Sequence, residues 1–364
     1  MSVKFFYINK RGSVSLFVVI FFSLLATVMV AGFVRVAIKD QQATLARNLS
    51  QSAYDASQAG IEDAKRVITE KDACGSLSST KCDNLRTKIN STSCNEANSL
   101  LKNPSTPSTN EIRVENANYS YNQAYTCVTI ENNTQDFLGS LNADSTKIIP
   151  LIGESTFDKI KLEWFTKLNS GGNTVTFPNY LIYNPVSIDT ATPPFLAVRL
   201  IQSPDNISSL NFLNSNTYFS RIFLRPNTSG SNALNFTSDA PESIKPIPYD
   251  ATCDPSFASG YACSINLNLP ATQNNSLIEL KSIYKNTDYR VTLYSGNNAV
   301  KFKGVQTKID STGRANDIFR RVETRLETTS IEAYPTSAIE VEGNFCKNFS
   351  LTTVASNPYS DCTP

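Results

Sequence analysis

The side chains able to do acid–base or nucleophilic chemistry are restricted in this 364-residue chain, because it contains no histidine. Serine–histidine–aspartate and cysteine–histidine catalysis are therefore excluded. Carboxylates remain as candidates, and a glycosidase would need two of them across a cleft. Three close pairs occur in the sequence: Glu62 with Asp63, Asp310 with Asp317, and Glu340 with Glu342. We interpret these carboxylates as solvated surface groups and expect no catalytic residue and no enzymatic activity.

Cysteine is the second chemically informative residue type. The eight cysteines are Cys74, Cys82, Cys94, Cys127, Cys253, Cys263, Cys346 and Cys362. None forms a C-x-x-C pair, and zinc sites usually combine such pairs with histidine. The even count instead indicates disulfides formed in an oxidising compartment. Short-loop closure favours Cys253–Cys263 and Cys346–Cys362, with the first four cysteines pairing among themselves. We expect neither a metal ion nor a cofactor.

A stretch of 22 residues near the N-terminus, from Ser13 to Val34, carries no charge. At 1.5 Å per residue a helix of this length spans about 33 Å, enough for a hydrocarbon core of about 30 Å. Lys4, Lys10 and Arg11 precede it, so the positive-inside bias predicts a cytoplasmic N-terminus and an extracytoplasmic remainder. The stretch also exceeds the apolar region of a cleaved secretory signal, which covers roughly 7–15 residues.

The helical pattern continues past Arg35. Small or apolar residues recur at steps of three, four and seven, which is the spacing of one helix face. These residues are Ile38, Leu45, Leu49, Ala53, Ala56, Gly60, Ala64 and Val67. No proline interrupts residues 13–70, so we predict a single helix over that range, about 87 Å long. The alternative is a membrane anchor followed by a separate helix.

Two blocks of this sequence resemble those of type IV pilins. Lys10-Arg11-Gly12-Ser13 is similar to the prepilin cleavage site, where a membrane peptidase cuts after a glycine that follows a short basic leader. The block Ala56-Ser57-Gln58-Ala59-Gly60-Ile61-Glu62-Asp63-Ala64 resembles the end of the long helix in PilX-type minor pilins and in K-type pseudopilins of type II secretion. This resemblance covers about the first 70 residues. It implies processing between Gly12 and Ser13 and a helix that contacts other pilin helices through residues such as Phe17, Arg35 and Gly60.

Two positions depart from the pattern of that family. Most members carry a glutamate at the fifth mature position, where this chain has Phe17. The glutamate is taken to neutralise the terminal amine of a neighbouring subunit, and a buried unpaired amine is costly. The resemblance therefore implies a minor, tip or initiating subunit in place of the repeating shaft. Gln58 likewise replaces the usual glutamate of the second block.

The region after the helix is predicted to form antiparallel strands. From about residue 111 the apolar period changes to two; Ile160, Leu162 and Trp164, for example, alternate with charged residues. Many short strands at such spacing favour a sandwich. Residues 310–314, Asp-Ser-Thr-Gly-Arg, are a hairpin turn motif, and the strand that follows resembles the closing strand of the pilin sheet. The predicted fold is α+β: a long transmembrane and amphipathic helix, then a pilin-like sheet with an inserted β-sandwich.

The predicted domain plan has six parts. They are a cytoplasmic leader (1–12), the long helix (13–70, with the membrane span at 13–34), a disulfide-stapled loop region (71–110), a pilin-like sheet (111–149 and 300–345), an inserted β-sandwich (150–299) and a C-terminal disulfide loop (346–364). Without the three basic residues that precede the span, 30 basic and 32 acidic residues remain. This near-neutral balance disfavours nucleic acid as a partner.

The sequence thus favours a minor pilin-like structural subunit of a type IV pilus or related filament. We expect a single-pass membrane protein whose extracytoplasmic head caps a tip, primes assembly or adheres to a surface. The expected partners are other pilin subunits, a prepilin peptidase, the membrane, and a surface ligand or host cell. One alternative is a membrane-anchored extracellular binding protein outside any filament. Another is a tethered hydrolase that works through carboxylates.

Overall fold

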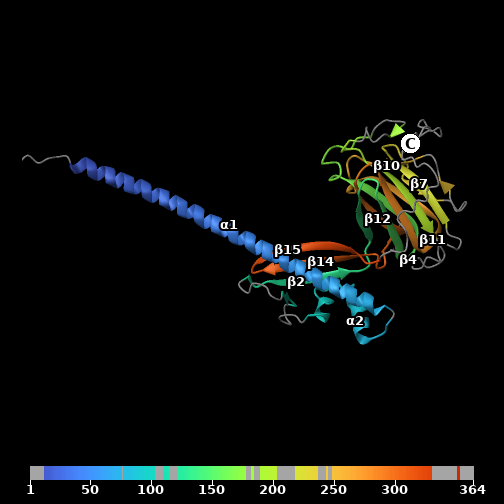
Figure 1. Ribbon diagram of the computed structural model, residues 1–364, viewed down its shortest axis with the longest axis horizontal. Helices are drawn as coiled ribbons and strands as arrows, with labels where there is room; N and C mark the ends of the chain where they lie inside the picture. Colours follow the sequence, from blue (N-terminus) through green and yellow to red (C-terminus); the bar gives the residue numbers. More distant parts are fainter. Residues whose placement is uncertain are drawn as a thin grey trace, which may run out of the picture. The chain divides into compact units, whose positions relative to one another are not determined.

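The computed structural model describes residues 12–75, 77–102, 110–114, 121–177, 182–183, 189–202, 218–236, 243–244, 248–329 and 351–352. The predicted Cys346–Cys362 bridge and the pair Glu340 and Glu342 lie outside these residues. The chain divides into two compact units, each described by itself below (Figure 1). The first comprises Met1–Thr129 and Asp310–Glu323, and the second comprises Ile130–Ile309 and Thr324–Pro364.

The secondary-structure elements follow one another from a long helix to a series of strands. In chain order they are α1 (Gly12–Cys74), α2 (Thr80–Lys88), the 3-10 helix η1 (Asn98–Leu100), β1 (Ile112–Arg113), β2 (Ala124–Glu131), β3 (Asp136–Leu141), β4 (Thr146–Thr166), β5 (Ile182–Tyr183), β6 (Phe195–Gln202), β7 (Tyr218–Asn227), β8 (Ala233–Asn235), β9 (Ser243–Ile244), β10 (Tyr249–Cys253), β11 (Tyr261–Ile283), β12 (Thr287–Ser295), β13 (Asn298–Val300), β14 (Gln306–Ala315), β15 (Ile318–Glu327) and β16 (Leu351–Thr352).

The prediction of one unbroken helix at the N-terminus is confirmed. α1 contains 63 residues, which corresponds to a length of about 94 Å. Its sequence contains no proline, so no residue removes a backbone donor and interrupts the ladder of hydrogen bonds. The helix ends at Cys74, after which Gly75 adopts a left-handed φ of 47°, the conformation that commonly terminates a helix.

The second half of α1 packs on a sheet of four strands in the order β1-β2-β14-β15. The helix residues on this face are Ala53, Ala56, Gly60, Ala64 and Val67, all of them buried as the spacing predicted. The Ser311 hydroxyl of β14 donates a hydrogen bond of 2.7 Å to the Ser57 carbonyl of the helix. Toward the N-terminal end of the same face, Ile38 and Leu45 are exposed.

The hairpin β14–β15 turns at a different place from the one predicted. The segment 310–314 belongs to β14, and the turn lies at Asn316 and Asp317, where Asn316 has a left-handed φ of 48°. Gly313 does not form the turn; it allows β14 to pack closely on α1. A Cβ atom at this position would lie 2.2 Å from the Ala53 carbonyl oxygen and 2.2 Å from the Ser57 nitrogen, so only glycine lets the strand approach the helix this closely.

Two disulfides join the first four cysteines among themselves, as predicted. Cys74–Cys82 links the end of α1 to α2, and Cys94–Cys127 links the segment between α2 and β1 to strand β2. The region 71–110, which was predicted to be a loop, contains more regular structure than expected, because α2 forms nine residues of helix there. The Ser79 side chain caps α2 by accepting a hydrogen bond from the Cys82 backbone N–H.

The second unit is built on one ten-stranded sheet. Its main path runs β10-β7-β6-β11-β4-β12-β13, and β3, β8 and β9 pair at its sides. β10 also pairs with β11 through Thr252↔Ser264 and Cys253↔Cys263. This pairing closes β11, β6, β7 and β10 into a barrel, so the predicted two-sheet sandwich over residues 150–299 is wrong.

The length of two strands explains the closed sheet. β4 has 21 residues and β11 has 23, and they pair with each other along most of that length. The register between them shifts between Asn268 and Asn275, around Pro270, and such irregularities bend and twist a strand. One half of β11 pairs with β10 and the other half with β6. A single bent strand thus runs through residues 263–269 and 276–283, where the sequence pattern predicts two separate strands.

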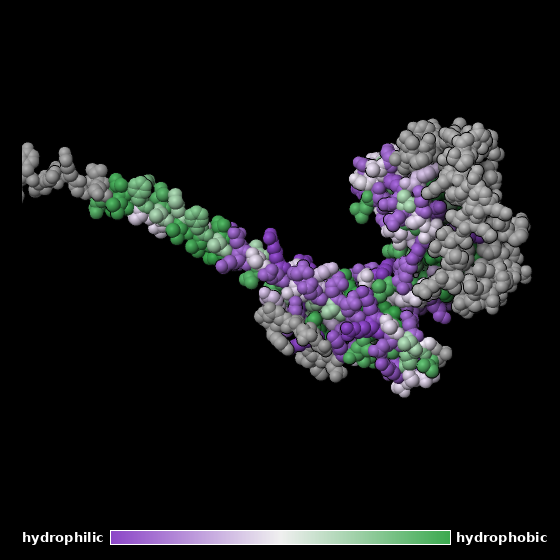
Figure 2. Space-filling view, in the orientation of Figure 1, coloured by the Kyte–Doolittle hydropathy of each residue, from purple (hydrophilic) through white to green (hydrophobic). Residues whose placement is uncertain are grey.

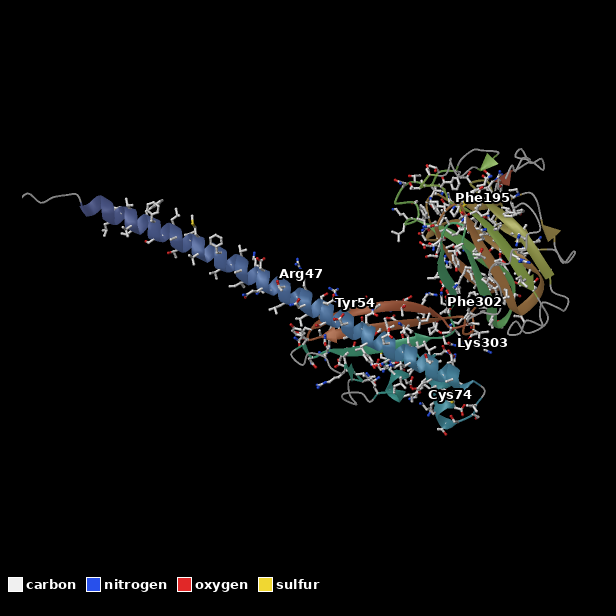
Figure 3. The ribbon with its side chains drawn as sticks, in the orientation of Figure 1. Arg47, Tyr54, Cys74, Phe195, Phe302 and Lys303 are labelled. Carbon is white, nitrogen blue, oxygen red and sulfur yellow. A yellow bond between two sulfur atoms is a disulfide. The ribbon has the colours of Figure 1, made fainter. Side chains whose placement is uncertain are left out.

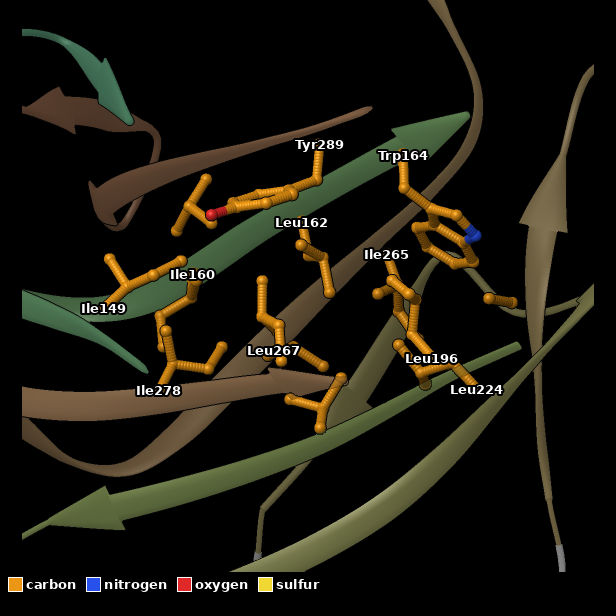
Figure 4. Close-up of a cluster of buried hydrophobic side chains, with 14 of the residues drawn as sticks. Ile149, Ile160, Leu162, Trp164, Leu196, Leu224, Ile265, Leu267, Ile278 and Tyr289 are labelled. Carbon is orange, nitrogen blue, oxygen red and sulfur yellow. The ribbon is translucent and has the colours of Figure 1, made fainter. Parts of the chain in front are cut away.

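The barrel encloses a continuous apolar core. Ile160, Leu162 and Trp164 of β4 are fully buried, which confirms their predicted alternation (Figure 4). They pack with Ile265 and Leu267 of β11 and with residues of β6, β7 and β12. Trp164, the single tryptophan of the chain, donates its indole N–H to the Pro194 carbonyl at 3.2 Å. Packed side chains therefore fill the space inside the strands, as in other small barrels.

The observed unit boundaries also differ from the predicted 111–149, 150–299 and 300–345. They fall after Thr129, Ile309 and Glu323, so β3, the first residues of β4 and β14, and the end of β15 belong to the second unit. Phe137 of β3 and Ile149 of β4 are part of the barrel core, which accounts for the shift. A separate two-stranded sheet pairs β5 with β16.

The Cys253–Cys263 disulfide should stabilise the closed barrel, because it joins one of only two registered residue pairs between β10 and β11. Replacing both cysteines with alanine removes a crosslink that closes a ten-residue separation. We expect a loss of about 3 kcal/mol in the free energy of unfolding. Urea unfolding followed by Trp164 fluorescence measures this, with the matched double substitution of Cys74 and Cys82 as the control. An unchanged midpoint in the Cys253/Cys263 variant would contradict the role assigned to this bridge.

Candidate functional site

The N-terminal part of α1 exposes large apolar side chains all around the helix, and Figure 2 shows one side of this apolar surface. Phe17 is 73% exposed and Phe33 75%, and every side chain described from Leu16 to Val34 is exposed. By length and composition the helix could cross a membrane. Burial of this much apolar surface is strongly favourable, at about 25 cal/mol per Å². The segment is therefore far more stable in an apolar environment than in water.

The predicted processing residues stand at the start of this segment. Gly12 is the first residue of α1 and Ser13 the second. The basic residues Lys4, Lys10 and Arg11 lie outside the described part of the chain. The apolar stretch begins at Ser13, so a cut between Gly12 and Ser13 would leave the exposed stretch intact.

A polar stretch of α1 follows the apolar one and is also uncovered. Every residue from Arg35 to Asn48 is exposed, and the first buried residue of the helix is Ser52. Arg47 projects from this stretch in Figure 3, and Tyr54 from the packed part that follows it. The 14 residues correspond to about 21 Å of helix without intramolecular packing. Because helices in proteins gain most of their stability from packing, this stretch is the second part of the candidate site.

Gly60 does not belong to the exposed surface. We predicted for it a role in contacts of the long helix with other helices, but it is buried against the helix's own sheet. A Cβ atom here would lie 2.5 Å from the Ser311 hydroxyl and 2.7 Å from a Val128 methyl group. Close packing within the first unit therefore requires glycine at this position. The spacing of small residues along the helix indicated a close contact but did not identify the partner.

Three carboxylates of the predicted pairs, Glu62, Asp63 and Asp310, are engaged in salt bridges or hydrogen bonds. Glu62 is exposed and contacts Lys65 at 2.6 Å. Asp63 is buried and accepts a hydrogen bond of 2.9 Å from the Tyr125 hydroxyl. Asp310 pairs with Arg321. Within the described residues no group of three or more cysteine, aspartate or glutamate side chains could hold a metal ion.

Glu163 is a buried carboxylate that the sequence pattern assigned to the solvent face of β4. It is 1% exposed and lies between two cations, with Arg290 Nε at 2.7 Å and Lys161 Nζ at 3.0 Å. Burial acts to raise the pKa of Glu163, but hydrogen bonds from Arg290 and Lys161 outweigh it and lower the pKa. The Arg290 guanidinium also stacks over the Tyr261 ring at 5.0 Å. A general acid needs a raised pKa, so this group suits an ion-pair network and not proton donation.

No family model matches the chain, and no curated protein and no solved structure was found to match it. Function is therefore inferred from the exposed half of α1 and from the structure of the two compact units.

Gly60→Ala should destabilise the first unit. The added Cβ would overlap Ser311 and Val128, and overpacking of this kind costs about 1–3 kcal/mol. Gly32→Ala is the matched control, because a Cβ there meets no atom within 4 Å and alanine favours helix. Thermal unfolding of the full chain in detergent, followed by far-UV circular dichroism, should show a lower Tm only for Gly60→Ala. An unchanged or higher Tm for this variant would refute the close contact.

Arg290→Met should destabilise the second unit by about 3 kcal/mol, because it leaves a buried carboxylate short of a partner. The pKa of Glu163 is lowered in the folded state, so its contribution to stability is present above the unfolded value of about 4.3 and is lost as pH falls through the lower folded value. Without Arg290 the folded pKa of Glu163 should lie closer to the unfolded value, so this acid loss should be smaller and should end at a higher pH in Arg290→Met. Urea unfolding over a pH series, with Lys281→Met as the control, measures both effects. Equal acid profiles for the two variants would contradict the assignment.

Proposed function

We propose that the chain is a minor pilin-like structural subunit of a type IV pilus or a related filament. One observation carries the proposal: α1 is unbroken from Gly12 to Cys74, and only its second half is covered by the protein itself. The first half therefore needs partners from outside the chain. A bilayer would cover this apolar surface before assembly. The helices of other subunits would cover it afterwards.

The polar stretch of α1 supports a filament over a simple anchor. A membrane accounts for the apolar residues up to Val34, but it does not cover the helix between Arg35 and Asn48. An anchor needs no such projecting helix, and a flexible linker would serve as well. Packing against the helices of neighbouring subunits gives these residues a use and a source of stability.

The nature of the head supports a presenting or capping role. Its barrel interior is filled by apolar side chains, so the barrel itself offers its outer surface and loops for contacts. At the proposed mature N-terminus, Phe17 leaves no carboxylate at the fifth position to neutralise a neighbour's amine. We therefore assign the subunit to a tip or initiating position, where its head primes assembly, caps the filament or adheres to a surface.

A membrane-anchored extracellular binding protein is the second candidate. The exposed apolar segment, which could cross a membrane, would serve it equally well. The two functions differ in where the protein is found: a filament subunit appears in the filaments sheared from cells, whereas an anchored protein stays with the membrane fraction. The hydrolase alternative has less support, because Glu62, Asp63 and Asp310 are engaged in ion pairs or hydrogen bonds.

Processing at Gly12 tests the proposal. When the full chain is produced together with a prepilin peptidase, the intact mass should show removal of residues 1–12 and a methylated Ser13. Gly12→Val should block this cleavage, since the peptidase recognises the glycine in the proteins this chain resembles. Gly32→Val alters Val30-Ala31-Gly32, the nearest match to the small-residue cut site of a secretory signal, and should leave cleavage at Gly12 unchanged. An intact leader, or a cut near Gly32, would argue strongly against pilin-type processing.

A further inference from the structure

The basic residues of α1 fall into two groups that differ in their partners. Lys65, Arg66 and Lys71, in the packed half, each contact a carboxylate of the same helix. Arg35, Lys39 and Arg47, in the exposed half, make no ion pair with any residue in the described part of the chain. These last three are exposed and charged, and no other described residue of the first unit covers the helix up to Asn48.

Arg35 and Lys39 also share one side of the helix. They are four residues apart, so one lies about 6 Å above the other on the same face. Asp40 is the acidic residue of this stretch, but the helical rotation of about 100° per residue places it on a different face from both. It therefore does not neutralise the pair. Arg47 lies 12 residues beyond Arg35, about 18 Å further along the axis.

We infer that Arg35 and Lys39 together bind the phosphate headgroup of an anionic phospholipid in the outer leaflet. The inference rests on the proposed membrane-inserted state of the subunit, with the head outside. The apolar stretch ends at Val34, and the span of about 33 Å slightly exceeds a hydrocarbon core of about 30 Å. Arg35 then emerges at the depth of the lipid phosphates, and Lys39 stands one turn above it.

The chemistry of the two side chains fits this ligand. A guanidinium offers paired donors that match phosphate oxygens, and a lysine ammonium adds a mobile point charge on a long stem. Both side chains can bend toward the interface while their methylene stems stay on apolar surface. Each basic residue near an anionic membrane surface contributes about 1 kcal/mol, and this contribution falls off within a screening length of about 8 Å. Arg35 and Lys39 lie within that distance of the interface, and Arg47 does not.

The test measures lipid retention by the full chain. The protein is reconstituted in nanodiscs of phosphatidylcholine containing about one tenth phosphatidylglycerol, and native mass spectrometry counts the lipids of each kind that remain bound. Arg35→Gln and Lys39→Gln should each lower phosphatidylglycerol retention about fivefold, the ratio that corresponds to 1 kcal/mol. The double variant should lower it by more than tenfold. Arg47→Gln is the matched control and should retain phosphatidylglycerol like the unmodified chain.

Two results would overturn the inference: equal retention in all variants, or an equal loss in Arg47→Gln. Chemical crosslinking of the same samples follows dimers of the chain. Equal retention together with loss of crosslinked dimers in Arg35→Gln/Lys39→Gln would identify an acidic side chain of a second copy as the partner. Resistance of the protein to alkaline extraction from vesicles is measured in parallel. Failure to insert would refute the proposed membrane state itself, whereas insertion without preferential retention refutes the lipid site alone. The substitutions preserve the orientation expected from positive-inside bias, because they remove charges on the outer side.

Discussion

The close approach of α1 to the four-stranded sheet is the constraint on which the first unit depends. It is made by two glycines, one on each partner: Gly60 of the helix faces Tyr125, Val128 and Ser311, and Gly313 of the strand faces the helix backbone at Ala53 and Ser57. Neither position has room for a Cβ atom. The Ser311 hydroxyl adds a direct hydrogen bond to the helix. The contact begins only at about Ser52. The second half of α1 is therefore packed within the protein itself, and the first half is left exposed for other partners.

The features that the sequence predicted well are those with local causes. An unbroken helix follows from the lack of proline and the steady apolar spacing within α1. The alternation of Ile160, Leu162 and Trp164 is visible over five residues and places all three in the barrel core. Cys253–Cys263 follows from a short separation in sequence. In each case the deciding interaction lies within a few residues of the motif, so no knowledge of the fold is needed.

The features that escaped prediction depend on residues far apart in the chain. Asp310 to Arg314 has the composition of a turn, but the packing of Gly313 on α1 gives this glycine a different purpose. The barrel closes because β10 pairs with β11, and no local pattern distinguishes that pairing from two stacked sheets. Glu163 alternates correctly for a solvent-facing position, yet Arg290 from β12 and Lys161 cover it with cations. Burial of a charge is stable only when such partners are supplied by neighbouring strands.

The stretch from Arg35 to Asn48 separates the candidate functions better than the apolar segment before it. A membrane anchor and a filament subunit both need the apolar segment, so its presence does not distinguish these two hypotheses. A fully exposed helix of mixed polarity is different, because it gains little stability alone and must be justified by what surrounds it. In the proposed membrane-inserted state Arg35 and Lys39 would lie beside the headgroups, and in a filament the same residues would face neighbouring helices. A subunit that moves between these two surroundings would need a helix able to accept both, and a stretch that combines basic residues with apolar ones such as Ile38 and Leu45 meets that requirement.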